Sequence, residues 1–142
     1  MTDPTQTNTD FDTAYLSTWT EPDAGKRLVL IEQVWAPHGS LHISSPSLSL
    51  NGTADIAAHI GRVHDDLIVG KGLTFRYDQR LKSGDALLLR WSMTTPGGDV
   101  VGRGVDTVFR DVGGKVTRAY MFMGVNRSEE HTPQLKPRPR SQ

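Results

Sequence analysis

The second half of the chain is divided by glycine-containing turns into four segments of strand-like sequence. This division constrains the fold more than any other feature. The turns are Ser83-Gly84, Pro96-Gly97-Gly98 and Gly113-Gly114, and short loops of this kind join antiparallel strands. We therefore expect four strands in a meander, over residues 73–81, 86–95, 100–110 and 116–125.

The first half shows helical spacing instead. Asp10 can cap a first helix that places apolar side chains from Phe11 to Trp19 on one face. A second helix is expected to end at Trp35, before Ala36-Pro37, and a third runs from Thr53, its predicted cap, to about Leu67. Two short extended pieces, 41–44 and 47–50, separate these two helices. Three helices before a four-stranded antiparallel sheet predict an α+β domain.

Composition excludes several classes of protein. A chain of 142 residues with 36% hydrophobic residues favours one globular domain. Sixteen basic residues balance sixteen acidic ones, so the broad positive charge of a nucleic-acid or membrane-surface binder is missing. The absence of cysteine excludes disulfides, a thiol nucleophile and a thiolate metal site.

Both ends of the chain are polar. Residues 1–9, and residues 127–142 with their three prolines, carry too little apolar surface to order themselves, so we expect disorder there and a folded domain over 10–126. The start has no signal-like apolar run, and no apolar stretch reaches the ~20 residues of a membrane span. We expect a soluble, cytoplasmic protein.

Hairpin geometry predicts which side chains share a face of the sheet. Even-length loops set Trp91 opposite Gly104, Leu89 opposite Asp106, and Asp106 opposite Met121. An odd loop length would move the partner strand to the other face. The predicted face is apolar, with two gaps at glycines and one carboxylate: Leu87, Leu89, Trp91, Met93, Gly102, Gly104, Asp106, Ala119, Met121 and Met123. The last three strands also carry apolar residues in the alternate positions, so the other face needs a cover, most simply a second subunit in a homodimer.

Asp106 is the informative residue of that face. Burial among Leu, Trp and Met raises the pKa of a carboxyl group, and a protonated carboxyl can donate a hydrogen bond to a ligand carbonyl or oxyanion. The alternative is structural: Asp106 accepts hydrogen bonds or pairs with Arg90, Arg103 or Arg110.

The histidines offer no metal site. His59 and His64 are about 140° apart around a helix, so they cannot chelate one ion, and we expect neither a metal nor a cofactor. His59 could face a pocket as an acid or base, or be a structural histidine. His42 lies in an edge strand, where a surface position is the alternative. We expect Trp91 in the pocket wall, and Met121 and Met123 as adaptable lining.

Three stretches resemble the nuclear-transport-factor-like, or SnoaL-like, superfamily. They are Tyr15-Leu16-Ser17-Thr18-Trp19 with the following helix to Val34-Trp35-Ala36-Pro37-His38-Gly39, then residues 50–60, then Val105-Asp106-Thr107-Val108-Phe109-Arg110 with Gly113-Gly114-Lys115-Val116. The resemblance implies a cystatin-like cone, with three N-terminal helices packed on a curved antiparallel sheet around an apolar pocket. It also implies dimerisation through the sheet.

Within this superfamily, residues 105–122 are similar to ketosteroid isomerases. That similarity implies that Tyr15 and Asp106 stabilise an enolate oxygen. The aspartate base of those enzymes is replaced here by Ser45, or by Ile43 on an ungapped alignment, and His42 is an alternative base. Limonene epoxide hydrolases are a weaker match, because Gly104 and Met121 stand where an arginine and an aspartate are needed. Polyketide cyclases, which use an acidic residue as acid or base, are compatible with Asp106.

The sequence thus predicts a pocket for a small hydrophobic ligand. We expect an isomerase, cyclase or hydratase acting on a carbonyl compound, with Asp106 as the acid, base or oxyanion donor and with Tyr15, His59 or His42 assisting. Trp19, Leu89, Trp91, Met93, Met121 and Met123 are the predicted substrate contacts. The alternatives are a binding or accessory protein without turnover, and a structural dimerisation module.

Overall fold

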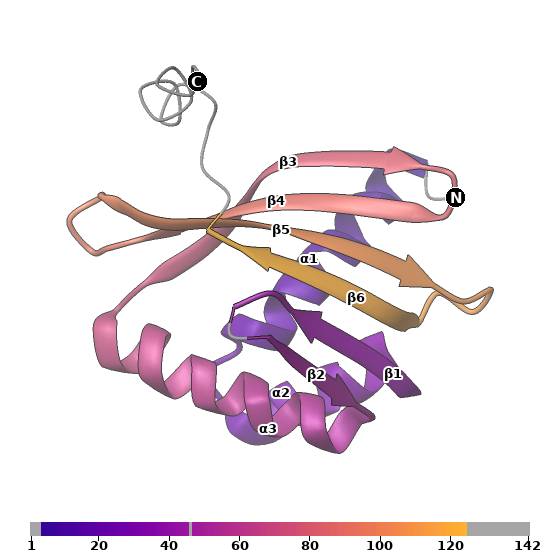
Figure 1. Ribbon diagram of the computed structural model, residues 1–142, viewed down its shortest axis with the longest axis horizontal. Coiled ribbons are helices and arrows are strands. Elements are labelled where there is room, and N and C mark those ends of the chain that lie inside the picture. The colour runs from indigo at the N-terminus through magenta and orange to yellow at the C-terminus, as the bar shows by residue number, and fades with distance from the viewer. Residues whose placement is uncertain (1–3, 46, 125–142) are drawn as a thin grey trace, which may run out of the picture.

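The computed structural model describes residues 4–45 and 47–124, with side chains from residue 10 onward. The elements follow in the order α1 (Pro4–Thr20), α2 (Ala24–Val34), β1 (Trp35–Ile43), β2 (Leu48–Asn51), α3 (Thr53–Val63), η1 (His64–Val69), β3 (Thr74–Ser83), β4 (Ala86–Thr94), β5 (Val100–Arg110) and β6 (Val116–Met123). The six strands form one curved, open sheet in the order β2-β1-β6-β5-β4-β3 (Figure 1). The chain is therefore an α+β domain.

The predicted meander is confirmed, and so is its register. Strands β3 to β6 pair antiparallel in chain order. Leu89 pairs with Asp106, Trp91 with Gly104, and Asp106 with Met121. Since side chains alternate between the faces of a sheet, these pairs place Asp106, Trp91 and Met121 on the same inner face.

The prediction of a wholly antiparallel sheet is wrong. Strand β1 pairs parallel to β6, with β2 antiparallel to β1 at the edge. The extended pieces expected over 41–44 and 47–50 correspond to the end of β1 and to β2. Strand β1 starts at Trp35, directly after α2. Pro37, which cannot donate to a ladder, lies where the β1–β6 pairing is interrupted between Trp35 and Ser40. The sequence signal was weak because this interruption breaks the alternation of the strand.

The helices also differ from the expected bounds. Helix α1 begins at Pro4, not at Asp10, so residues 4–9 continue the helix although we expected them to be disordered; proline is favourable in a first helical turn. The N-cap of α3 is Gly52, with a φ of 89°, and Thr53 is the first helical residue. The tail over 127–142 lies outside the described residues.

The core lies between the inner face of the sheet and the helices. Tyr15 from α1, Ile31 from α2 and Ile56 from α3 are buried against Leu41 and Leu89 of the sheet. Among the described residues, no helix has both the length and the apolar character required to cross a bilayer.

Candidate functional site

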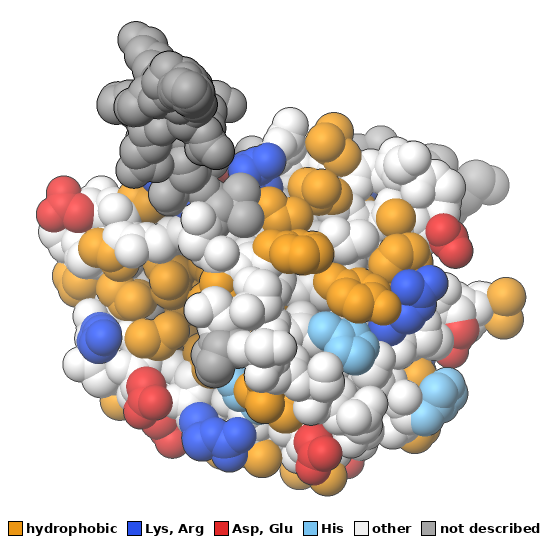
Figure 2. Space-filling model, in the orientation of Figure 1, with side chains coloured by type: hydrophobic (Ala, Val, Ile, Leu, Met, Phe, Trp, Pro, Cys, Tyr) orange, Lys and Arg blue, Asp and Glu red, His pale blue; other side chains and the backbone are white. Residues whose placement is uncertain are grey.

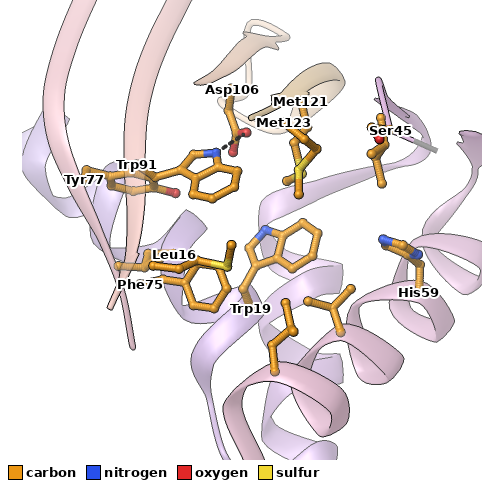
Figure 3. A pocket seen from close by; sticks show the side chains of 14 residues that line it. Leu16, Trp19, Ser45, His59, Phe75, Tyr77, Trp91, Asp106, Met121 and Met123 are labelled. Atoms are coloured by element: carbon orange, nitrogen blue, oxygen red, sulfur yellow. Dashed lines mark hydrogen bonds between the residues drawn. The ribbon is translucent and has the colours of Figure 1, made fainter. Parts of the chain in front are cut away.

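The core does not fill the whole inner face. Beyond Leu89, toward the β4–β5 hairpin, the sheet and the helices enclose a cavity of about 200 Å³. Its walls come from α1, β1, α3, η1 and strands β3 to β6 (Figure 3). The lining residues are Leu16, Trp19, Ile43, Ser45, His59, Val63, Leu67, Phe75, Tyr77, Trp91, Met93, Asp106, Met121 and Met123.

Asp106 is the carboxylate of this cavity. Its side chain is buried, and its Oδ1 accepts a hydrogen bond of 2.9 Å from Nε1 of Trp91 on the neighbouring strand (Figure 3). Because that bond occupies Oδ1, Oδ2 is left to carry a proton. Of the structural alternative, one half is present, since Asp106 accepts this hydrogen bond; the other half, an ion pair with an arginine, is not among the salt bridges of the described residues.

Gly104 explains how the indole reaches this carboxyl group. It pairs with Trp91 across β4 and β5, and a Cβ at Gly104 would overlap the six-membered ring of the indole. The indole therefore lies against the position that a side chain would occupy at Gly104, and its N–H donates to Asp106. Gly102 gives the same space to the end of Met93. The two predicted gaps, at Gly102 and Gly104, are thus filled by side chains of the neighbouring strand β4.

Burial dominates the acidity of Asp106. Removal from water raises the pKa of this carboxyl group from its usual 3.8 to about 7, and the hydrogen bond from Trp91 opposes the rise only in part. Near neutral pH the group is therefore present in both protonated and ionised forms. A group in this condition can both give and accept a proton.

His59 of α3 is the other ionisable side chain close to neutral pH in the lining. It faces the cavity on a different wall from Asp106 (Figure 3), with its ring edge-on to Trp19 at 6.2 Å. Partial burial, assisted by the positive charge of Arg62, lowers the pKa of His59 below 6.5. The imidazole is therefore neutral at pH 7 and can accept a proton.

Tyr77 supplies the phenol of the cavity, and Tyr15 does not. Tyr15, which the resemblance assigned to this role, is fully buried between the rings of Phe11 and Trp35 and does not line the cavity. Its hydroxyl has no hydrogen-bond partner. Tyr77 of β3 lines the cavity instead, with its ring beside Trp91 (Figure 3). Burial, and then the nearby Asp106, raises the pKa of both phenols, so both stay protonated at neutral pH.

Two further predicted site residues lie elsewhere. His42 is on the outer face, where its ring stacks on Tyr120 at 4.9 Å and its nitrogens bond to the hydroxyls of Ser40 and Ser49. It therefore cannot serve as a base in the cavity. Leu89 is fully buried in the core beside the cavity rather than in its lining.

The remaining predicted contacts do line the cavity: Trp19, Trp91, Met93, Met121 and Met123. Ser45 and Ile43 lie in the lining too, so the position of the missing aspartate base is at the cavity but carries no carboxylate. The described residues hold no cluster of acidic or histidine side chains suited to a metal ion.

Sequence reasoning missed Tyr77 because β3 is bulged. Ser83 pairs with Ala86, so an unbroken ladder would place Asp78 opposite Trp91. The register shifts between Tyr77 and Gln79, and Tyr77 becomes the partner of Trp91. The aromatic side chains of β3 were visible in the sequence, but the bulge that turns them inward carries no clear signal.

Comparison with solved structures gives close matches in fold. A candidate isomerase of the SnoaL-like family from Agrobacterium tumefaciens matches at a TM-score of 0.71 and 25% identity, over 80% of this chain and 94% of that one. A protein with a ketosteroid isomerase-like fold from Catenulispora acidiphila, in complex with trimethylamine, matches at 0.61 and 15% identity, over 84% and 85%.

A candidate polyketide cyclase from Sinorhizobium meliloti matches at a TM-score of 0.60 and 13% identity, over 79% of this chain and 93% of that one. Other similar structures are described as cystatin-like or NTF2-like. No family model and no curated protein matches the chain.

Proposed function

Since the chain has the fold of the SnoaL-like and NTF2-like superfamily, we propose that it is an enzyme that moves protons on a small, apolar carbonyl compound. The reaction class is isomerisation, cyclisation or hydration. The observation that carries the proposal is Asp106: one carboxyl group, with its pKa raised to about 7, at an apolar cavity with room for a single ring.

In the proposed reaction His59 is the base and Asp106 is the acid. Neutral His59 removes a proton from the carbon next to the substrate carbonyl, and the carbonyl oxygen takes up negative charge. Protonated Asp106 donates a hydrogen bond through Oδ2 to that oxygen, while Trp91 holds Oδ1. Return of the proton from His59 to a different carbon gives an isomer of the same formula, with both side chains restored.

Tyr77 adds a neutral hydrogen-bond donor to the same cavity. Because its pKa is raised, its phenol keeps its proton while the substrate oxygen becomes negative. An oxyanion that meets two preorganised donors in an apolar cavity is stabilised more than it would be in solution.

Isomerisation of 3-cyclohexen-1-one to its conjugated isomer tests the proposal. The substrate has one ring, and the product absorbs in the ultraviolet. We expect acceleration by the wild type, a loss of about 10²–10⁴-fold in Asp106→Leu and His59→Ala, and no change in His42→Ala, the matched control on the outer face. The acid must be protonated and the base neutral, so activity should fall above pH 7 and below the lowered pKa of His59. A rate equal to that of buffer would contradict the proposal.

A ligand-binding protein without turnover is the second candidate. It is favoured by one observation, the absence of a carboxylate other than Asp106 among the described cavity residues. In that case phenol should bind to the wild type, and Asp106→Asn should bind it equally well without any isomerisation. Phenol binding is measured by calorimetry.

Dimerisation through the outer face of the sheet remains a prediction. Phe109, Tyr120 and the half-exposed Phe122 lie on this face, with the guanidinium of Arg118 3.8 Å from the centre of the Phe109 ring. Figure 2 shows hydrophobic side chains gathered over the middle of the sheet. Sedimentation of the wild type and of Phe122→Lys tests the prediction: a dimer that becomes a monomer supports it, and a monomeric wild type contradicts it.

A further inference from the structure

A second recess adjoins the cavity on the side of the β4–β5 hairpin. It has a volume of about 380 Å³ and is lined by Leu67, Lys71, Leu73, Met93, Thr95 and Val101. Leu67 and Met93 also line the inner cavity. These two side chains therefore stand between the two spaces.

The recess lies between two separate parts of the chain. Leu67 belongs to η1, and Lys71 and Leu73 follow it, while Thr95 and Val101 belong to the β4–β5 hairpin. Figure 1 shows the hairpin and the end of η1 at the same side of the molecule, and Figure 2 shows hydrophobic side chains gathered there. The inner cavity thus has a neighbouring space outside it.

The partition between the two spaces includes an adaptable side chain. Met93 lies over the backbone of Gly102, its partner across the ladder, because no Cβ occupies that position. Methionine is unbranched and rotates easily, so it can make room for a narrow chain. Leu67, opposite it, comes from a π-helical turn, a local geometry that is frequent at functional sites.

The two spaces differ in charge and in size. The inner cavity is close to the ~150 Å³ apolar cavity that accepts benzene, and below the ~300–1,000 Å³ of typical ligand pockets. It therefore suits a single ring. The outer recess has an exposed lysine, Lys71, which takes part in no salt bridge among the described residues. Asp65 and Asp66, in the first turn of η1, line neither space.

We propose that the substrate is an elongated molecule with a one-ring, carbonyl-bearing head and an acidic tail. The head occupies the inner cavity beside Asp106. The tail passes between Leu67 and Met93, and its carboxylate meets the ammonium group of Lys71. This inference rests on the proposed function for the position of the carbonyl, and it narrows the substrate class from any small apolar ketone to a ring-bearing carboxylic acid.

Binding of matched phenols tests the inference without any turnover. The probes are phenol, the 4-alkylphenols, and ω-(4-hydroxyphenyl)alkanoates with chains of two to six carbons, titrated by calorimetry. At least one of these alkanoates should bind about 2- to 5-fold more tightly than the alkylphenol of the same chain length. This is the gain in affinity expected from one exposed ion pair. This preference should decline as salt is added.

Three variants locate the effect. Lys71→Gln should abolish the preference for the carboxylate and leave the alkylphenols unchanged, while Lys26→Gln, on the exposed part of α2, should change nothing. Val101→Trp, at a residue that lines the outer recess and not the inner cavity, should fill the recess, so that the tail adds no affinity while phenol itself still binds. Carboxylates that bind no better than alkylphenols, or a preference that survives Lys71→Gln, would overturn the inference.

The outcomes also separate this inference from the proposed function. If phenol binds but the tail adds nothing, the inner cavity remains and only the elongated substrate is wrong. If phenol does not bind at all, both are wrong. If the tail adds affinity through Lys71 but 3-cyclohexen-1-one is not isomerised, the inference stands and the catalytic proposal fails.

Discussion

The two ends of the inner face of the sheet differ in how completely side chains fill the space under the helices. At one end Leu87, Leu89 and Val108 are buried against Tyr15 and Ile56, and the space is filled. At the other end Trp91 and Met93 occupy the space left by Gly104 and Gly102, and the helices leave a cavity. Asp106 stands at the boundary, because its ladder partner is Leu89 of the filled end and its hydrogen-bond donor is Trp91 of the cavity end. The comparison shows that one sheet, with a single strand order, can combine a stabilising core and a ligand site when glycines and a bulge alter one end of its inner face.

Truncation should have its largest effect at the filled end. Leu89→Ala should lower the free energy of unfolding by about 2–5 kcal/mol, because it opens a void in a fully buried site. Met123→Ala, the matched variant at the cavity, should lower it by less than about 2 kcal/mol, since its side chain already borders empty space. Urea unfolding of both variants measures the difference. Equal losses would contradict the division into two ends.

The pH dependence of stability should identify the boundary residue. The folded protein raises the pKa of Asp106 from 3.8 to about 7, so between these values the unfolded chain loses a proton that the folded chain keeps. Stability should therefore fall as pH rises from 4 to 7, by up to about 4 kcal/mol, and level off above pH 7. In Asp106→Asn this component should vanish. Unfolding curves for both proteins at each pH provide the measurement, and identical pH profiles would contradict it.

Substitution of Gly104 should lower the free energy of unfolding by less than the truncation of Leu89. A Cβ in Gly104→Ala overlaps the indole of Trp91, so the ring must move, at a cost of about 1–3 kcal/mol. The hydrogen bond that lowers the pKa of Asp106 is then lost, and that pKa should rise further. Gly25→Ala, in the first turn of α2, is the control and should not affect Asp106. Titration of the Asp106 carboxyl by NMR reports the shift; an unchanged value would show that Trp91 is not its main partner.

The smallest effect should come from the two tyrosines. Tyr15→Phe removes a buried hydroxyl that has no partner, so it should be neutral or stabilise the protein by up to about 1 kcal/mol, with no change in phenol binding. Tyr77→Phe should weaken phenol binding instead. Thermal unfolding and calorimetry distinguish the two. Weaker phenol binding in Tyr15→Phe, with unchanged binding in Tyr77→Phe, would contradict this and would place Tyr15 in the site.

Local sequence rules were sufficient for the part of the site that lies on the meander. The predicted pairs of Asp106 with Leu89 and Met121 are present, although the loops have odd rather than the expected even lengths. A register shift in each hairpin, between Met93 and Thr94 and between Phe109 and Arg110, compensates for this. The same rules failed where a strand is irregular. The bulge before Gln79 brought Tyr77 inward, and the interrupted pairing at Pro37 hid most of β1. Neither irregularity follows from alternation, because each depends on contacts with a distant strand.

The direction of His42 and the position of Tyr15 were beyond sequence reasoning for a different reason. An edge strand offers two faces, and His42 takes the outer one because Ser40, Ser49 and Tyr120 provide partners there. Tyr15 has the right place in the chain for a site residue, but the rings of Phe11 and Trp35 enclose it. Both outcomes depend on packing between elements far apart in sequence.

The parallel pairing of β1 with β6 also has a consequence for folding. It joins Trp35 to Val116 and Ile43 to Met121, contacts between the first strand and the last. During synthesis the early helices and β1 must therefore wait for almost the entire domain to leave the ribosome before their long-range partner exists. Contacts of such separation slow folding, because a large loop must close before they form. Until then β1 has an open edge, so the nascent chain is most exposed to misassociation just before its final strand is complete.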